Sequence, residues 1–119
     1  MPDARRAVGA AGEAAVAAWY EAAGFTVVDR NWRVRDGEID VVARRGGVLV
    51  FCEVKTRRSD AYGSPAEAVT ARKQARLRKL ALQWLDAHDA RAAQLRFDVA
   101  SVRPDGRGNW IVDVLEAAF

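Results

Sequence analysis

The sequence has one cysteine, one histidine and no apolar run close to the roughly 20 residues that a membrane-spanning helix requires. A single cysteine excludes a disulfide within the chain, so we expect Cys52 to be a small core residue in a reducing, cytoplasmic setting. His88 has no second histidine or cysteine at ligand spacing, and we expect it near a helix end at the surface. The charged N-terminus lacks the apolar segment of a secretory signal peptide, so we expect none.

Half of the chain is hydrophobic, and its charges nearly balance. The hydrophobic share of 50% in 119 residues is enough to build one core, which predicts a single domain over residues 1–119. Lysine and arginine number 19 against 16 acidic residues, and the net charge of +3 permits an anionic partner without demanding one. We expect no membrane contact.

Residues 37–55 contain two apolar runs on either side of Gly46 and Gly47, a dipeptide that favours a two-residue hairpin loop. The resulting register opposes Arg45 to Val48, Val42 to Phe51, Asp40 to Glu53, and Glu38 to Lys55. Opposed residues share a face, with Cβ atoms roughly 4.5–5.5 Å apart. The hairpin therefore predicts a charged cluster at its open end. Strand alternation places Ile39, Val41, Val50 and Val54 on one face and Val42, Leu49 and Phe51 on the other.

Two interpretations of this charged cluster remain open. Opposed carboxylates repel unless another charge holds them, and one Asp with one Glu suits Mg²⁺ or Mn²⁺, which complete their shells with water and substrate phosphate. Alternatively, the cluster is an ordinary strand end at which Lys55 neutralises two solvated acids, Asp40 and Glu53. The spacing alone favours neither interpretation.

The remaining periodicity predicts two helices and four further strand segments. The alanine-rich first helix covers about 4–23, and the second opens at the capping sequence from Ser64 or restarts at Thr70 and reaches about His88. Strands are expected at 25–28, 32–35, 95–102 and 110–115, giving the order αβββαββ. A turn at Asp36 and Gly37 would pair Arg35 with Glu38 and Arg33 with Asp40.

Several charged residues allow a structural or a functional interpretation. Glu13 borders the apolar stripe of the first helix, where it either reaches water or points into a site. In the second helix, Lys73 extends the apolar face, and a basic stripe lies on the other side: Arg72, Arg76 and Lys79. Such a stripe suits phosphates, but a solvated helix face explains it equally well. Asp98 is the polar residue of an apolar strand, and we expect it to face solvent or to pair locally.

Asp40, followed across the hairpin by Glu53-Val54-Lys55, resembles the D…(D/E)xK motif of the restriction-endonuclease-like PD-(D/E)xK nuclease superfamily, although Ile39 replaces the usual proline. More narrowly, almost the whole chain is similar to the YraN-like family of small bacterial proteins, through Gly12-Glu13, Asn31, residues 37–40, residues 51–57, Gly63-Ser64-Pro65 and Lys73. Within the superfamily the arrangement most resembles archaeal Holliday-junction resolvases. The resemblance implies an α/β (α+β) fold with a mixed central sheet and helices packed on it.

The same resemblance implies an activity and roles for particular residues. Asp40 and Glu53 would be ligands of Mg²⁺ or Mn²⁺, with Glu13 joining directly or through water, and Lys55 would orient or activate the attacking water. Glu38 faces Lys55 in the predicted register and either positions that lysine or binds metal. On this resemblance, nucleic acid would be held by Arg57, Arg58 and Lys73, and the basic stripe of the second helix adds Arg72 and Arg76.

We therefore expect an endonuclease that acts on nucleic acid, with branched or otherwise structured DNA as the expected substrate. One alternative is a non-catalytic nucleic-acid-binding or assembly module that keeps the nuclease fold. Another is a small structural protein. Cutting a junction symmetrically would require a homodimer, for which Trp110 and residues 115–119 are candidate contacts unless they close the core instead.

Overall fold

The computed structural model describes residues 4–57 and 70–119. In chain order the elements are α1 (Ala4–Ala22), β1 (Thr26–Val34), β2 (Gly37–Arg45), β3 (Val48–Thr56), α2 (Ala71–Ala87), β4 (Gln94–Pro104) and β5 (Trp110–Leu115). The predicted order αβββαββ is confirmed. The Ser64 capping sequence lies outside the described residues, whereas Thr70 caps α2 by accepting a hydrogen bond from the backbone N–H of Lys73.

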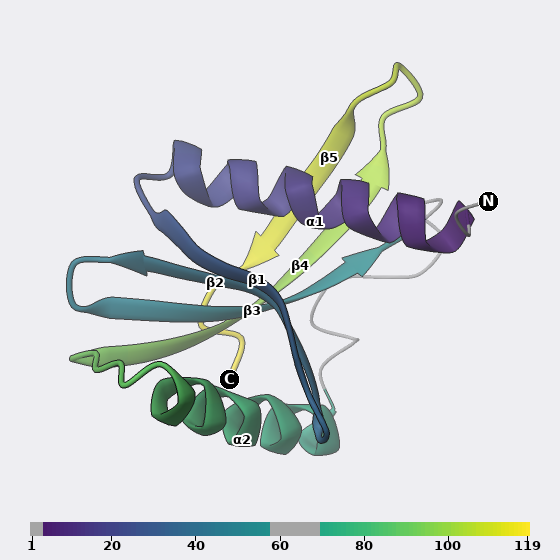
Figure 1. Ribbon diagram of the computed structural model, residues 1–119. Helices are drawn as coiled ribbons and strands as arrows, with labels where there is room; N and C mark the ends of the chain where they lie inside the picture. The colour runs from purple at the N-terminus through teal and green to yellow at the C-terminus, as the bar shows by residue number, and fades with distance from the viewer. Residues whose placement is uncertain (1–3, 58–69) are drawn as a thin grey trace.

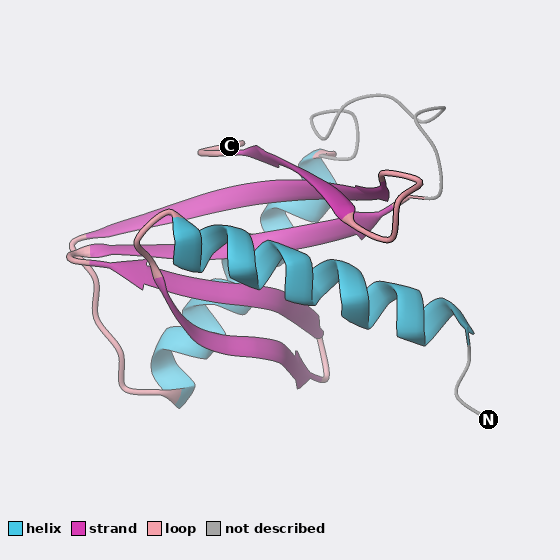
Figure 2. Ribbon diagram, turned by 90° about the horizontal axis from the view of Figure 1, so that it is seen from above, coloured by secondary structure: helices cyan, strands magenta, loops and turns pink. Residues whose placement is uncertain are grey.

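The five strands form one open, mixed sheet in the order β1-β2-β3-β4-β5. Strands β3 and β4 are parallel and the other neighbours are antiparallel. Because parallel neighbours need a crossover connection, α2 lies on one face of the sheet, opposite α1 (Figures 1 and 2). Neither helix is long and apolar enough to cross a membrane, within the part of the chain described.

Each face of the sheet has its own apolar core. Val16 and Tyr20 of α1 pack on Val41, Val50 and other residues of the upper face in Figure 1. The opposite core joins α2 to the sheet through Leu77, Leu80, Ala81, Trp84, Val42, Leu49, Phe51, Phe97 and Ile39. The face predicted for Ile39 is therefore wrong, because the β1–β2 hairpin bends towards α2 at this point (Figure 1).

Strand β1 is continuous, and its register differs from the prediction. It runs through residues 29–31, which separate the two predicted strands 25–28 and 32–35, and a bulge lies between Val27 and Asp29. Arg33 pairs with Glu38 and Val34 with Gly37, so the turn is Arg35-Asp36 and the predicted pairing through Asp36-Gly37 is wrong. Asp36 is held in this turn by contacts with two residues of α2, Gln83 at 2.8 Å and Lys79 at 3.5 Å.

The β2–β3 hairpin has the predicted register near its turn but not at its open end. Backbone pairing runs from Arg45/Val48 through Val42/Phe51 to Val41/Cys52. The predicted pairs Asp40/Glu53 and Glu38/Lys55 lie beyond this ladder and do not form. Strand β2 follows β1 towards α2, whereas β3 continues beside β4, so the two strands diverge (Figure 1).

Asp98 is fully buried, which corrects the expectation that it faces solvent. Its carboxylate accepts hydrogen bonds from the Tyr20 hydroxyl at 2.6 Å, from Arg96 at 2.9 and 3.0 Å, and from the Ala117 N–H at 3.0 Å. Only Arg96 is a local partner. The buried acid thus ties α1, β4 and the C-terminal segment together.

The C-terminal aromatic residues contribute to the two cores. Trp110 is half-buried and packs against the core beneath α1. Phe119 stacks on Phe97 at the other face, with 5.2 Å between ring centroids. Trp110 and Phe119 therefore help to close the two cores.

Candidate functional site

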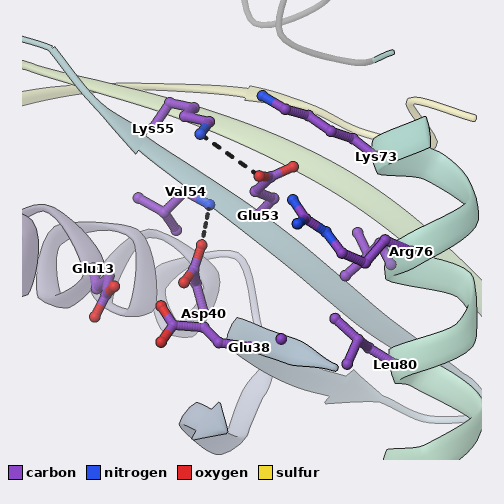
Figure 3. A pocket seen from close by; sticks show the side chains of 11 residues that line it. Glu13, Glu38, Asp40, Glu53, Val54, Lys55, Lys73, Arg76 and Leu80 are labelled. Atoms are coloured by element: carbon purple, nitrogen blue, oxygen red, sulfur yellow. Dashed lines mark hydrogen bonds and ion pairs between the residues drawn. The ribbon is translucent and has the colours of Figure 1, made fainter. Parts of the chain in front are cut away.

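A pocket of about 320 Å³ opens where β2 and β3 diverge, between the two helices (Figure 3). Every side chain proposed from the motif as catalytic lies in its wall. The lining residues are Glu13, Gly37, Glu38, Asp40, Glu53, Val54, Lys55, Lys73, Arg76, Leu77 and Leu80. Strand divergence, rather than cross-strand opposition, therefore brings the charged residues together.

Asp40 is the most enclosed acid of the pocket. Its carboxylate accepts a hydrogen bond of 2.8 Å from the backbone N–H of Val54, across the gap between the diverging strands. Burial, together with a hydrogen bond shared with Glu38, raises the pKa of Asp40 to about 8. Without a bound metal, the Asp40 carboxyl group therefore keeps its proton near neutral pH.

Glu13 and Glu38 lie beside Asp40, and carboxylate oxygens of the three residues all lie within 4.8 Å of one another. Burial and the charge of Glu38 raise the pKa of Glu13, against opposing effects of Asn31 and two arginines. The hydrogen bond with Asp40 lowers the pKa of Glu38, which also pairs with Arg33 at 2.6 Å. The prediction that Glu38 faces Lys55 is therefore wrong, because the strands have already separated.

A close approach of α1 to β3 places Glu13 in the pocket. Gly12 is buried against Thr56, and a Cβ atom at position 12 would overlap the Thr56 hydroxyl. Only glycine lets the helix lie this close to the strand. The next residue of α1, Glu13, consequently reaches the acids of β2.

Glu53 and Lys55 lie on the β3 side of the pocket. The Lys55 ammonium is 3.7 Å from a Glu53 carboxylate oxygen (Figure 3). The predicted metal-binding acids Asp40, Glu53 and Glu13 thus share one pocket, but the tightest group of three contains Glu38 in place of Glu53. Glu38 immediately precedes Ile39-Asp40 in the sequence, and this adjacency, rather than the predicted opposition to Lys55, places it in the pocket.

Two of the five predicted nucleic-acid-binding residues line the pocket. Lys73 and Arg76, one helical turn apart on α2, line the pocket, whereas Arg72 is exposed and does not. Arg57 follows β3, and its backbone N–H donates to the Val102 carbonyl at 2.7 Å. Arg58 lies outside the described residues.

Two further residues near the pocket contact its acids in ways that the sequence did not predict. Arg33 was expected to pair with Asp40 but holds Glu38, and its exposed side chain limits this contact to a surface ion pair. Asn31 forms a side-chain hydrogen bond with Glu13, from a backbone conformation with φ of 52°. Asparagine tolerates this left-handed region better than most residues, and its place among the residues of the family resemblance was the available signal.

The profile of the uncharacterised protein family UPF0102 matches residues 12–102 of this chain. The chain belongs to the UPF0102 family. Because the YraN-like proteins are the UPF0102 family, this match confirms the family that the sequence predicted. A UPF0102 protein of Beutenbergia cavernae is 58% identical over 99 residues, covering 83% of this chain and 84% of the relative.

Other UPF0102 proteins match over nearly the full length. One from Parafrankia sp. is 49% identical over 112 residues, covering 94% of this chain and 95% of its own. One from Symbiobacterium thermophilum is 48% identical over 114 residues, covering 96% of this chain and 97% of its own. Every residue that lines the pocket, from Glu13 to Leu80, falls within the segment matched by the UPF0102 profile.

Proposed function

We propose that this UPF0102 protein is a metal-dependent endonuclease with a restriction-endonuclease-like fold, which hydrolyses phosphodiester bonds in branched or otherwise structured DNA. The observation that carries the proposal is the meeting of Asp40, Glu53 and Lys55 in one pocket. These are the residue types that phosphodiester hydrolysis needs, in the order of the D…(D/E)xK motif. A purely structural role would not need four acids in one recess.

The acids fit a hard divalent cation. Glu13, Glu38 and Asp40 offer oxygen ligands within 4.8 Å of one another, and Mg²⁺ and Mn²⁺ prefer oxygen ligands. Glu53, in the same pocket, would complete the shell directly or through water. A cation bound here would polarise the phosphoryl group and make hydroxide available near neutral pH.

The other residues of the pocket would act on the substrate and the water. The Lys55 ammonium, positioned by Glu53 at 3.7 Å, would orient the attacking water and stabilise negative charge that develops on the phosphate. Lys73 and Arg76 would offset the repulsion between the acids and the DNA backbone, because they supply positive charge from the facing helix.

We propose a reducing, cytoplasmic setting, which the free and buried Cys52 supports. A symmetric cut across a four-way junction needs two such pockets, so we also propose that two copies of the chain act on one junction. Light scattering of the protein with and without four-way DNA tests this stoichiometry. A complex with one copy per junction would contradict it.

The activity is tested with a labelled panel of linear, flapped and four-way DNA, and matching RNA, in Mg²⁺ or Mn²⁺. We expect the wild type to cut a structured DNA, and we expect Asp40→Ala and Lys55→Ala to abolish cutting while circular dichroism shows that both remain folded. Binding without cutting in either metal would instead favour a nucleic-acid-binding module.

A further inference from the structure

We infer that Arg76 binds the phosphate group that is hydrolysed, from the wall of the pocket opposite the acids. This inference rests on the proposed function and adds a contact that the motif does not contain. Figure 3 shows the guanidinium group of Arg76 extending from α2 towards Glu53 and the middle of the pocket. Lys73 instead extends along the edge of the pocket nearest Lys55 (Figure 3).

The neighbours of Arg76 fix the position of its part of α2, from which the exposed Arg76 side chain extends. Leu77 and Leu80 are buried, with exposed fractions of 6% and 2%, so they anchor this part of α2 against the sheet. The stem of Arg76 passes over Gly37: its Cδ atom would lie 3.8 Å from a Cβ at that position, and Leu80 Cδ1 only 3.2 Å away. The missing side chain at Gly37 therefore makes room for Leu80, while the stem of Arg76 lies beside it at ordinary contact distance.

No acid within residues 4–57 and 70–119 neutralises the charge of Arg76. Lys55 pairs with Glu53, and Lys79 pairs with Asp36. Among the described residues, Arg76 forms no ion pair. A cation of the pocket that no acid engages is available for a ligand with negative charge.

The charge balance of the pocket shows why a phosphate needs a positive side chain beside it. Four acids line it, against the three cations Lys55, Lys73 and Arg76. A DNA phosphate entering among the acids is repelled unless positive charge faces it. Arginine presents a planar fork that matches two phosphate oxygens, whereas lysine acts as a point charge. Arg76 is thus suited to orient the scissile phosphate, and Lys73 to hold a neighbouring one.

The kinetic test compares Arg76→Gln and Arg76→Lys with the wild type in single-turnover cleavage at saturating DNA. We expect Arg76→Gln to lower the rate about 100-fold, as for the loss of one oriented donor to a developing charge, with a much smaller change in DNA affinity. Arg76→Lys should recover only part of the rate. The matched control is Arg91→Gln, which removes the same charge after α2, at the other end of the sheet from the pocket, and should leave the rate unchanged.

A second measurement does not depend on cleavage. The Arg76 side-chain Nε–H signal, assigned by its loss in Arg76→Lys, is followed by nuclear magnetic resonance during titration with a thymidine dinucleotide. We expect this signal to shift, and the signals of other exposed arginines to shift less. A shift in a protein that cuts nothing supports the phosphate contact and refutes the nuclease. If the wild type cuts DNA and Arg76→Gln cuts it at the same rate, the inference about Arg76 is wrong but the nuclease stands. If no signal shifts and no DNA is cut, both the inference and the proposed function are wrong.

Discussion

The carboxylate of Asp40 accepts a 2.8 Å hydrogen bond from the backbone N–H of Val54, just beyond the last backbone pair of β2 and β3. A side chain therefore takes the donor that a longer ladder would have used. The bond bridges two strands that are separating and holds the acid at the pocket. The proposed chemistry depends on this position of Asp40, and so does the pH dependence of stability.

Asp40→Asn should remove a pH-dependent loss of stability. Burial raises the pKa of Asp40 to about 8, against about 3.9 in an unfolded chain, so the folded protein binds more protons between these values. Without metal, the free energy of unfolding therefore falls as the pH rises from about 4 to 8. At pH 8 the variant should be more stable by on the order of 2 kcal/mol. Thermal unfolding in a chelator from pH 5 to 8.5 measures this, and parallel curves for both proteins would refute it.

Gly12→Ala should push α1 away from β3, because the new methyl group would overlap the Thr56 hydroxyl. We expect a loss of about 1–3 kcal/mol in the free energy of unfolding. Adding Thr56→Ala should restore part of this loss. The control is Gly9→Ala on the same helix, where a Cβ meets nothing within 4 Å and should stabilise the protein by up to about 1 kcal/mol. Equal effects of the two alanines in urea unfolding would contradict the proposed close contact.

Asp98→Ala should be among the most destabilising single changes in the chain. It leaves the Arg96 guanidinium and the Tyr20 hydroxyl without their buried acceptor, and such a loss is worth about 3–5 kcal/mol. Tyr20→Phe removes one of these bonds and should lower stability by only about 1 kcal/mol. Chemical unfolding of both variants measures the difference, and a similar small effect in each would show that the network contributes little.

Glu38→Gln should weaken metal binding although the D…(D/E)xK motif does not include Glu38. Its carboxylate belongs to the group of three oxygens within 4.8 Å, so we expect roughly tenfold weaker binding of Mn²⁺, measured by water-proton relaxation. Glu21→Gln, on the exposed side of α1, is the matched control and should bind as the wild type does. Unchanged affinity in Glu38→Gln would exclude this acid from the metal site.

Local patterns predicted the elements, and the motif identified charged residues that share the pocket. The Gly46-Gly47 turn set the register as far as Val41/Cys52, because a short loop constrains only the pairs near it. Helical spacing predicted an apolar stripe on each helix, and both helices pack one apolar face on the sheet. The motif residues Asp40, Glu53 and Lys55 all reached the pocket.

The errors have long-range causes. Strand β3 leaves β2 and stays beside its parallel neighbour β4. The sequence of a turn does not predict such a pairing. The burial of Asp98 depends on Tyr20, 78 residues earlier in the chain. The shifted β1–β2 turn is held by contacts of Asp36 with Gln83 and Lys79 on α2. Each requires a partner that local spacing does not specify.

Cleavage of four-way DNA in water labelled with oxygen-18 tests the proposed hydrolysis most directly. With Mg²⁺ or Mn²⁺, the wild type should give products whose terminal phosphate carries one labelled oxygen per cut, and Asp40→Asn prepared identically should give none. Intact DNA with either metal would contradict the nuclease, and so would equal cutting by the wild type and Asp40→Asn.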